Sequence, residues 1–332
     1  MQQNWCQQMN ILVTGGAGYL GSKLLLRLGE EFPEATITSI DNLATGDYSY
    51  VAMLKKDKRY RLLVGDISKK DDLQKALTKD TDAIVHLAAV PGLKLCREHP
   101  KNAVDTNFYG TYLLLEKAVE HNIERFVFTS SAAVYGKPQQ QPITEEHPLK
   151  PINFYGVTKT AGEQLINAYH ISNGLTTTIL RLSNLYGLGV YTRWKTVVPK
   201  FVWQMVNNQP LTIRGDGKQE RNFVHVRDVV SAIVQCLKAS RQVVAGETFN
   251  IGGETMNINR VAEIIIQVAE QRLGKKTTKV YTSKQPDEVY TTEFGYDYGK
   301  ASRKIGYEPK QEIYHGVSEL VDYALKIKTE KS

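Results

Sequence analysis

The sequence predicts a doubly wound α/β fold with a mostly parallel sheet and a smaller C-terminal α/β lobe. Short runs rich in β-branched residues alternate with helical patterns through the first half of the chain, as in successive βαβ units. The runs ILVT, AIVHLA and RFVFTS are apolar almost without interruption, which strands require when helices cover both faces of their sheet. Strands are therefore expected at 10–14, 36–41, 60–66, 82–88, 125–130 and 176–182.

Two long helices are expected among these strands, at 101–122 and 153–173, because apolar residues recur there at steps of three and four. After about Leu182 the pattern loosens into loops, a helix near 197–207 and shorter pieces. A chain of 332 residues exceeds the usual size of one domain, roughly 100 to 200 residues. We divide it into an extension (1–8), a first domain (9–182) and a second lobe (183–332), with strands near 223–226 and 249–251 that could return to the first sheet.

Composition favours a globular protein of the reducing cytoplasm. The formal net charge is +7, but Lys and Arg are interleaved with Asp and Glu, which does not indicate a nucleic-acid partner. No window approaches the roughly 18 apolar residues of a membrane span. Cys6, Cys96 and Cys236 lie far apart without metal-binding spacing, so neither a metal site nor disulfides are predicted. Residues 1–8 lack the pattern of a secretory signal and precede Met9, which stands directly before the first strand.

A glycine-rich turn follows the first expected strand and opens a helical run. Gly15 permits a tight turn off the strand, Gly18 lets backbone approach a pyrophosphate at the helix N-terminus, and Gly21 permits close packing of helix and strand. Such glycines alone are weak evidence, and an ordinary βα turn is the alternative. The strand before them and the helix after them favour a dinucleotide site in a Rossmann-type sheet.

Asp41 ends the second expected strand, twenty positions beyond Gly21. A carboxylate there accepts hydrogen bonds from the adenosine ribose hydroxyls and repels a 2′-phosphate, which predicts NAD rather than NADP. A simple turn residue before Asn42 is the alternative role for Asp41. Asp66, at the end of the third expected strand, is placed to meet the adenine amino group.

Tyr155 and Lys159 stand one helical turn apart, so the ammonium group is close enough to favour a phenolate. Spacing alone does not single them out. The same spacing occurs at Tyr19/Lys23, Tyr191/Lys195 and Tyr296/Lys300. Only Tyr155 begins a helix after the fifth expected strand, which is followed by Ser131. Strand ends in a doubly wound sheet meet at the ligand crevice, so Ser131, Tyr155 and Lys159 are expected to converge there.

These three residue types suit the oxidation of an alcohol. A base must take the hydroxyl proton while hydride leaves carbon for the nicotinamide, and Tyr155 as phenolate would be that base. Moving the pKa of a phenol from about 10 to about 7 needs roughly 4 kcal/mol, which Lys159 and the oxidised nicotinamide share. Ser131 would hold the same oxygen and polarise the carbonyl formed. A local backbone bond for Ser131 and simple packing for Tyr155 are the alternatives.

Five segments resemble the extended short-chain dehydrogenase/reductase family. The closest resemblance is to its NAD-dependent epimerase/dehydratase branch, which includes UDP-glucose 4-epimerase. The likeness covers nearly the whole chain from Met9, and its first-half motifs are the more specific. The segments are TGGAGYLG (14–21), HLAA (86–89), FTSSAAVYG (128–136), YGVTK (155–159) and RLSNLYG (181–187).

This resemblance implies a nucleoside diphosphate sugar as substrate and NAD that is reduced and reoxidised within one cycle. Asn184 and Arg221 match the family's diphosphate contacts, and a guanidinium suits phosphate oxygens. A turn cap for Asn184 and a surface ion pair for Arg221 are the alternatives. No metal is implied. Cofactor contacts are expected at Gly15, Gly18, Tyr19, Leu20, Gly21, Asp41, Asn42, Asp66, Ile67, Leu87, Ala88, Ala89, Thr129, Tyr155 and Lys159. Substrate contacts are expected at Ser131, Asn184, Thr212, Arg214 and Arg221.

Departures from the family pattern favour a 4-epimerase. Dehydratases and decarboxylases of the family typically place an acid at the position of Ala133, and dehydratases often place one at Ala132 as well. Two alanines therefore argue against both reactions. Arg214 stands where relatives often have an aromatic residue, and Gln285 stands near the position of a second diphosphate-binding Arg, so the nucleotide is not defined.

Two other functions remain open at this stage. A dehydrogenase or reductase of a non-nucleotide alcohol would use the same Ser, Tyr and Lys chemistry but release NADH. A catalytically silent dinucleotide sensor would not need these three residues. The helices expected at 101–122 and 153–173 resemble those that pair in relatives, which implies a homodimer. A solvent-facing pair of helices is the alternative.

Overall fold

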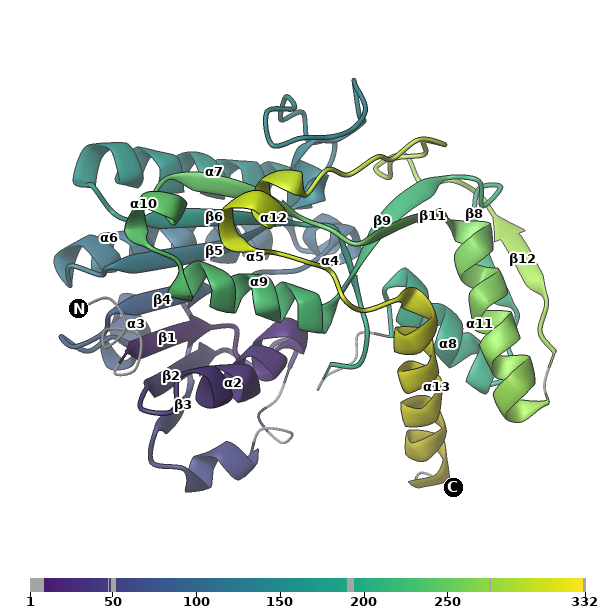
Figure 1. Ribbon diagram of the computed structural model, residues 1–332, viewed down its shortest axis with the longest axis horizontal. Helices are drawn as coiled ribbons and strands as arrows, with labels where there is room; N and C mark the ends of the chain where they lie inside the picture. The colour runs from purple at the N-terminus through teal and green to yellow at the C-terminus, as the bar shows by residue number, and fades with distance from the viewer. Residues whose placement is uncertain (1–8, 47, 49–51, 190–193, 275, 331–332) are drawn as a thin grey trace.

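The computed structural model describes residues 9–46, 48, 52–189, 194–274 and 276–330 (Figure 1). A seven-stranded sheet forms its larger part, with the strand order β10-β6-β5-β4-β1-β2-β3, and all its neighbouring strands are parallel. The mostly parallel, doubly wound sheet predicted from the sequence is thereby confirmed. Its strands are β1 (Asn10–Thr14), β2 (Thr36–Asp41), β3 (Tyr60–Val64), β4 (Ala83–His86), β5 (Arg125–Ser131), β6 (Thr177–Leu182) and β10 (Glu247–Ile251).

Helices cover both faces of this sheet (Figure 1). Successive residues of one strand point to opposite faces, so Ile11 and Val13 of β1 pack in one apolar layer while Leu12 packs in the other. The first layer includes α2 (Tyr19–Glu31) and α9 (Val226–Lys238). The second layer includes α3 (Lys70–Ala76), α6 (Thr111–Glu120) and α7 (Phe154–Asn173). Burial on both faces explains why the strand sequences are continuously apolar.

The helix expected at 101–122 is divided into three consecutive parts. These are α5 (Pro100–Val104), a π-helical turn (Asp105–Gly110) and α6. Asn107 lies in the wider turn, where its buried side chain bonds to the backbone of Val90 and to Thr158. The π turn thus coincides with a side chain that binds outside its own helix.

A second apolar core lies in the C-terminal lobe, between α8 (Val197–Val206), α11 (Ile258–Leu273) and α13 (Ile313–Glu330). The lobe also holds two small sheets, with the orders β11-β9-β7 and β12-β8. Their strands are β7 (Asn184–Tyr186), β8 (Leu211–Arg214), β9 (Glu220–His225), β11 (Glu254–Asn257) and β12 (Lys279–Thr282). The remaining short helices are η1 (Ala52–Lys56), α4 (Leu93–Glu98), η3 (Ala132–Val134), α10 (Arg241–Val244) and α12 (Gly299–Ile305).

The two strands that could have returned to the first sheet behave differently. The strand expected near 249–251 does return, because β10 pairs with β6 along its whole length. The strand expected near 223–226 does not, because β9 pairs with β7 and β11 in the lobe. After β9 the chain crosses back as α9, which packs beside α2. The C-terminal half therefore supplies β10, α9 and the short helices α10 and α12 to the first domain.

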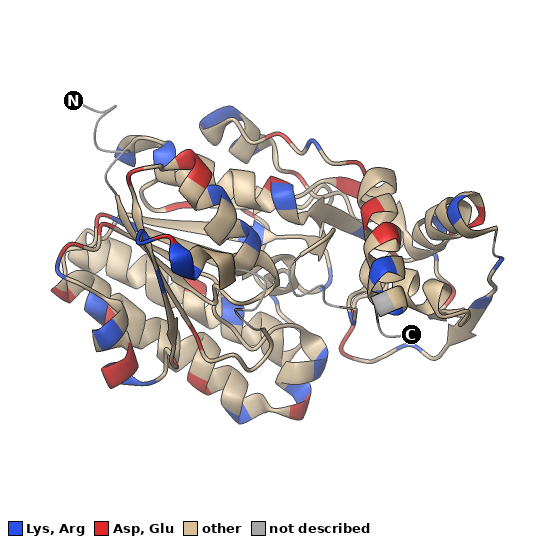
Figure 2. Cartoon of the chain, turned by 90° about the horizontal axis from the view of Figure 1, so that it is seen from below, with Lys and Arg blue, Asp and Glu red and all other residues tan. Residues whose placement is uncertain are grey.

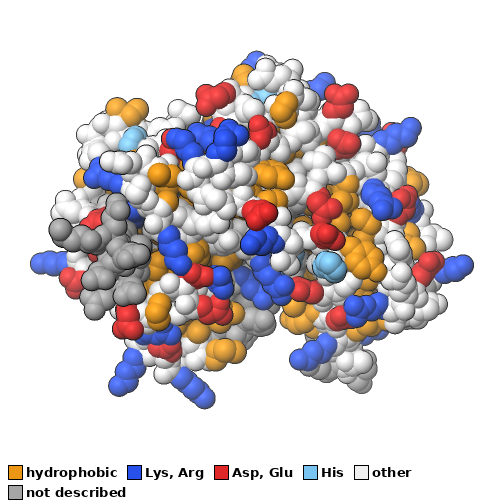
Figure 3. Space-filling model, in the orientation of Figure 1, with side chains coloured by type: hydrophobic (Ala, Val, Ile, Leu, Met, Phe, Trp, Pro, Cys, Tyr) orange, Lys and Arg blue, Asp and Glu red, His pale blue; other side chains and the backbone are white. Residues whose placement is uncertain are grey.

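Basic and acidic side chains are interspersed over the molecule, as the sequence predicted (Figures 2 and 3). Within the described ranges, no helix is both long enough and apolar enough to cross a membrane.

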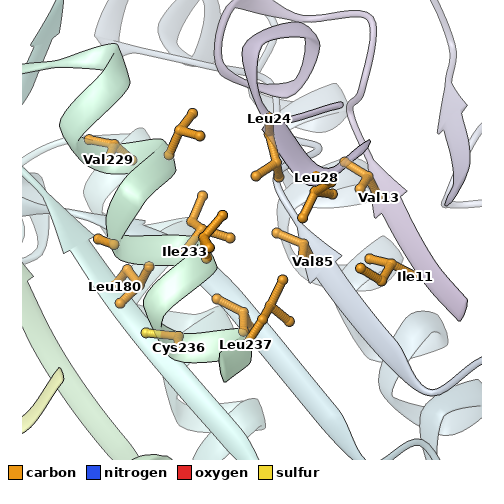
Figure 4. Packing of buried hydrophobic residues seen from close by; sticks show 14 of the residues in the cluster. Ile11, Val13, Leu24, Leu28, Val85, Leu180, Val229, Ile233, Cys236 and Leu237 are labelled. Carbon is orange, nitrogen blue, oxygen red and sulfur yellow. The ribbon is translucent and has the colours of Figure 1, made fainter. Parts of the chain in front are cut away.

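The contact between α9 and α2 offers a test of the first apolar layer. Figure 4 shows Ile233 of α9 within this layer, and its side chain is fully buried. We expect Ile233→Ala to lower the free energy of unfolding by about 2 to 5 kcal/mol, because it leaves a cavity. The exposed Met53 is the control, and Met53→Ala should change the free energy of unfolding by less than about 0.5 kcal/mol. Urea unfolding measures both, and equal losses would contradict the assignment.

Candidate active site

A cavity of about 530 Å³ opens at the carboxyl end of the seven-stranded sheet. Residues at or just beyond the ends of β1, β2, β4, β5 and β6 line it, together with the first turns of α2 and α7. Ligands of doubly wound sheets bind at this edge. Sixteen of the residues expected at the site line the cavity: Gly15, Gly18, Tyr19, Leu20, Gly21, Asp41, Asn42, Ile67, Leu87, Ala88, Ala89, Thr129, Ser131, Tyr155, Lys159 and Asn184.

The glycine-rich turn has the geometry that a dinucleotide needs. Gly15 has a φ of +75°, and a Cβ there would lie 2.8 Å from the backbone nitrogen of Ala88. A Cβ on Gly21 would lie 2.1 Å from the carbonyl oxygen of Gly15, so only glycine lets α2 start this close to the turn. Gly18 precedes α2 and no side chain caps that helix. The N-terminus of α2 therefore suits a pyrophosphate.

Asp41 ties the end of β2 to this turn. Its carboxylate accepts hydrogen bonds from the backbone N–H groups of Ala17, at 3.0 Å, and Leu43, at 2.8 Å. Burial raises the pKa of Asp41, while these two hydrogen bonds oppose the rise. Each oxygen keeps a lone pair for a ribose hydroxyl, so the residues present fit an NAD molecule with its adenosine end here.

Four of the expected contacts lie outside the cavity lining. Asp66 sits between the lining residues Gly65 and Ile67, but its carboxylate accepts hydrogen bonds from Ser68 and Asn42. Thr212, Arg214 and Arg221 lie in the C-terminal lobe, where each is bonded within the protein. Gln204 donates to Thr212, Arg214 forms an ion pair with Glu288, and Arg221 donates to backbone oxygens of Glu220 and Val289.

Ser131, Tyr155 and Lys159 meet at the other end of the cavity. Ser131 ends β5, and its Oγ accepts a hydrogen bond from the Ala133 backbone nitrogen at 3.2 Å. Asn153 caps the N-terminus of α7 by accepting a hydrogen bond from the Gly156 nitrogen at 2.8 Å. This cap sets the first turn of α7, which presents Tyr155 to the cavity with Lys159 one turn later.

The other Tyr/Lys pairs have different partners. The Tyr19 hydroxyl donates to the carbonyl oxygen of Gly187. Tyr296 is buried and donates to the carbonyl oxygen of Arg181, and Lys300 pairs with Glu247. Tyr191 lies outside the described residues.

Lys159 is a buried cation. Its side chain is 2% exposed, and Nζ donates to the carbonyl oxygen of Thr129 at 2.8 Å. Burial lowers the pKa of Lys159 to about 8, against the opposing influence of Cys96 and Glu163. The side chain is therefore protonated at neutral pH. It supplies a positive charge one helical turn from Tyr155 in a medium of low polarity, where charge acts strongly.

His86, at the end of β4, adds no second charge beside Lys159. Burial, followed by the charge of Lys159, lowers the pKa of His86 to about 3. The neutral ring bonds to the hydroxyls of Thr14 at 2.8 Å and Thr111 at 2.9 Å, one on each ring nitrogen.

A buried polar network supports the catalytic end from behind. Glu163 lies one turn beyond Lys159 on α7 and forms an ion pair with Arg181 of β6, with 2.8 Å between Nη2 and Oε2. Ser130 of β5 donates to the same carboxylate. Arg181 also donates to the Tyr135 hydroxyl at 2.9 Å. The network thus joins α7 to β5 and β6, two of the strands whose ends line the cavity.

Several lining residues were not expected from the sequence. The segment after β4 could have been expected at the cavity, because loops at the carboxyl ends of strands form the ligand crevice of such sheets. No local motif indicates the residues of the C-terminal half, because only the tertiary fold brings them to the cavity. The segment from β4 to the π turn contributes Val90, Pro91, Gly92, Leu95, His99, Asn102 and Thr106, and the C-terminal half contributes Ser183, Leu185, Thr196, Val197, Val198 and Phe223.

Oxidation of an alcohol needs a hydride acceptor beside a group that takes the proton, and one cavity here offers a place for both. Its dinucleotide end and its Ser, Tyr and Lys end lie at the same edge of a Rossmann-type sheet. Together they define the class as an extended short-chain dehydrogenase/reductase.

Comparison with known proteins makes the assignment more specific. The chain belongs to the NAD-dependent epimerase/dehydratase family, whose model matches residues 11–252. The resemblance inferred from the motifs is thereby confirmed, and so is NAD as the cofactor.

The relatives include epimerases and dehydratases. A putative UDP-glucose 4-epimerase of Methanocaldococcus jannaschii is 32% identical, covering 94% of this chain and 97% of its own. A UDP-glucuronic acid 4-epimerase from Bacillus cereus, solved with UDP-glucuronic acid and NAD, has a TM-score of 0.86 and 30% identity, covering 96% of this chain and 100% of its own. A dTDP-glucose 4,6-dehydratase from Streptomyces venezuelae, solved with NAD, has a TM-score of 0.87 and 28% identity, covering 97% and 98%.

The depressed pKa of Lys159 predicts a specific pH dependence of stability. Between pH 8 and pH 10.5 the unfolded chain keeps the Lys159 proton longer than the folded chain, so this group makes unfolding less favourable as pH rises. Relative to Lys159→Met, the NAD-free wild type should gain about 2 kcal/mol between pH 7 and 9.5.

Urea unfolding at several pH values measures this difference. The exposed Lys218 is the matched control, and Lys218→Met should follow the wild type at every pH. Parallel curves for wild type and Lys159→Met would contradict a pKa near 8.

Proposed function

We propose that the protein is an NAD-dependent nucleotide-sugar epimerase of the 4-epimerase type. The observation that supports this most directly is the distribution of acids in the cavity. Among its described lining residues, Asp41 is the one carboxylate, and it belongs to the adenosine end. Ala132 and Ala133 follow Ser131, where elimination of water would need an acid. The arrangement favours oxidation and re-reduction of a carbinol over dehydration.

The proposed chemistry assigns one role to each of three side chains. Tyr155 as phenolate takes the proton of the sugar hydroxyl and later returns it to the ketone oxygen. The buried Lys159 cation favours the phenolate. Ser131 donates a hydrogen bond to the reacting oxygen and stabilises charge that develops on it. When bound, NAD would supply a hydride acceptor that also serves as the donor in the return step, so the net reaction would be redox-neutral.

The proposed substrate is a nucleoside diphosphate sugar. Solved relatives bind UDP-glucuronic acid and, in the case of an epimerase from Thermotoga maritima, UDP-glucose. Asn184 lines the cavity toward the C-terminal lobe, and Arg221 lies two residues before the lining residue Phe223 on β9. Both are therefore placed at the lobe side, away from the adenosine end. The buried thiols of Cys96 and Cys236, which form no disulfide with each other, suit the proposed location in the cytoplasm.

Turnover of candidate sugar nucleotides tests the proposal. UDP-, dTDP- and GDP-hexoses incubated with the protein should yield their C4 epimers, detected by NMR, without a lasting rise in absorbance at 340 nm. Tyr155→Phe should lower kcat by about 10² to 10⁴-fold, because the base is lost. The exposed Tyr281 gives the control, and Tyr281→Phe should be as active as the wild type.

Two outcomes would contradict epimerisation. Net production of NADH, with or without a nucleotide on the substrate, would indicate a dehydrogenase instead. Loss of water from the sugar would indicate a dehydratase.

We also propose that the protein is a homodimer. α5, the π turn, α6 and α7 expose a group of large apolar side chains on neighbouring helices. Phe154 is 52% exposed, and the rings of Tyr109 and Tyr112 stack with centroids 6.1 Å apart. Such clustered exposure is typical of an interface between subunits. The other members are Val104, Phe108 and Val157.

Charge placed in this group should separate the subunits. The double variant Tyr112→Glu/Val157→Glu is expected to have half the mass of the wild type in light scattering, because two glutamates would be buried without partners. Val280→Glu/Tyr281→Glu places the same charges on exposed apolar residues of the lobe and should leave the mass unchanged. A wild-type mass of one chain would disprove the dimer.

A further inference from the structure

Three basic side chains gather in the C-terminal lobe beside the cavity. Val197 of α8 lines the cavity, and Lys200 lies one helical turn later on the same side of the helix. Phe223 of β9 also lines it, and Arg221 lies two residues earlier on the same face of the strand. Lys200 Nζ donates to the carbonyl oxygen of Thr212 on β8 at 3.2 Å, and Arg214 ends that strand.

Glu288 lies among these cations. It forms an ion pair with Arg214, and the carbonyl oxygen of the next residue, Val289, accepts a hydrogen bond from Arg221. The negative charge of Glu288 opposes the lowering of the pKa of Lys200 and of Arg221 by burial. The Tyr290 hydroxyl donates to Glu288 Oε2 at 3.0 Å and holds the carboxylate in this position. In the part of the lobe that the structure describes, Glu288 is the carboxylate that these cations share.

The cation cluster, meaning Lys200, Arg214, Arg221 and Glu288, has more positive than negative charge. Three cations and one carboxylate leave a formal charge of +2. The side chains are partly removed from water, which strengthens repulsion among the cations. Burial, followed by the charge of Arg214, lowers the pKa of Lys200, and burial lowers the pKa of Arg221. Without Glu288 the three cations carry a formal charge of +3, and the two charges of a sugar nucleotide's diphosphate would offset more of it than one carboxylate does.

We propose that Glu288 is an internal counter-anion that occupies the place of the substrate's diphosphate, and that Lys200 is a further ligand of that diphosphate. The inference rests on the proposed nucleotide-sugar substrate. It accounts for the contacts of Arg214 with Glu288 and of Arg221 with the carbonyl oxygen of Val289. The same guanidinium groups pair with phosphate oxygens once the segment at 288–289 releases them.

The neighbouring residue explains how this segment stays in place when Glu288 is released. Asp287 pairs with Arg97 of α4, with 2.9 Å between Nη1 and Oδ1, and its carbonyl oxygen accepts a hydrogen bond from Asn153 at 3.3 Å. These contacts hold Asp287 to the first domain, whereas Glu288 is held to the lobe. Release of Glu288 therefore requires movement of one side chain and its local backbone, without loss of the anchor at Asp287.

Binding measurements on the NAD-loaded protein test the inference. Glu288→Gln should bind UDP, dTDP or GDP about tenfold more tightly than the wild type, because the competing charge is gone. Lys200→Met should bind them about tenfold more weakly, because a charged contact is lost. Pyrophosphate serves as a second probe without a nucleoside. Calorimetry gives Kd, and NAD content and melting temperature establish that each variant is folded.

Matched variants control for general charge effects. Glu293→Gln removes an exposed carboxylate from the same segment, and Lys218→Met removes an exposed cation from the turn between β8 and β9. Both should bind UDP, dTDP and GDP within about twofold of the wild type, because surface charges are screened.

The outcomes separate this inference from the proposed function. Equal or weaker nucleotide binding by Glu288→Gln would overturn the role of Glu288, even if the wild type is an epimerase. Unchanged binding by Lys200→Met would overturn the role of Lys200. If no nucleoside diphosphate binds but pyrophosphate binds more tightly to Glu288→Gln than to the wild type, the result supports the anion site and contradicts the proposed nucleotide substrate. If neither probe binds, both proposals fail.

Discussion

The hydrogen bond between the Lys159 ammonium and the Thr129 carbonyl oxygen fixes α7 against the end of β5. Tyr155 precedes Lys159 by one turn, and Ser131 follows Thr129 by two residues, so this contact helps to set how Ser131, Tyr155 and Lys159 are placed relative to one another. A buried ammonium is costly, which is why its pKa falls to about 8. The fold retains a destabilising charge at the position where the chemistry needs one, as active sites often do.

The polar network behind Lys159 limits that cost and connects it to the C-terminal half. Glu163 provides negative charge one turn away, and Arg181 pairs with Glu163 so that the carboxylate is not left unpaired. Tyr135 accepts a hydrogen bond from Arg181 and donates to Asn250 of β10, a strand contributed by the later part of the chain. The return of β10 to the first sheet therefore completes the support of the catalytic helix as well as the sheet.

Local patterns in the sequence were sufficient to predict the sheet and to place Ser131, Tyr155 and Lys159 at one cavity. Apolar runs defined the strands to within two residues, and the glycine-rich turn and Tyr155/Lys159 could be found because each is a short motif on one element. The π turn could not be predicted, since it depends on Asn107 bonding to Val90 and Thr158. The ion pair of Arg97 with Asp287 joins residues 190 positions apart, and no local pattern specifies it. Long-range pairing likewise decided that β9 stays in the lobe.

The cations of the lobe lie apart from Tyr155 and Ser131, and this arrangement suits a reaction that must use both faces of one sugar. Epimerisation by oxidation and re-reduction requires the keto-sugar to present opposite faces to the same cofactor, so the sugar itself must be held loosely. Binding energy can then come from a remote part of the substrate, which is the general advantage of groups that do not react. The cations of the lobe are remote in this sense from Tyr155 and Ser131. With Glu288 as an internal counter-anion, a diphosphate must displace this carboxylate before it binds. Only the difference between the interaction energies of the two anions with the cations then contributes to affinity. The lower affinity also favours release of the product.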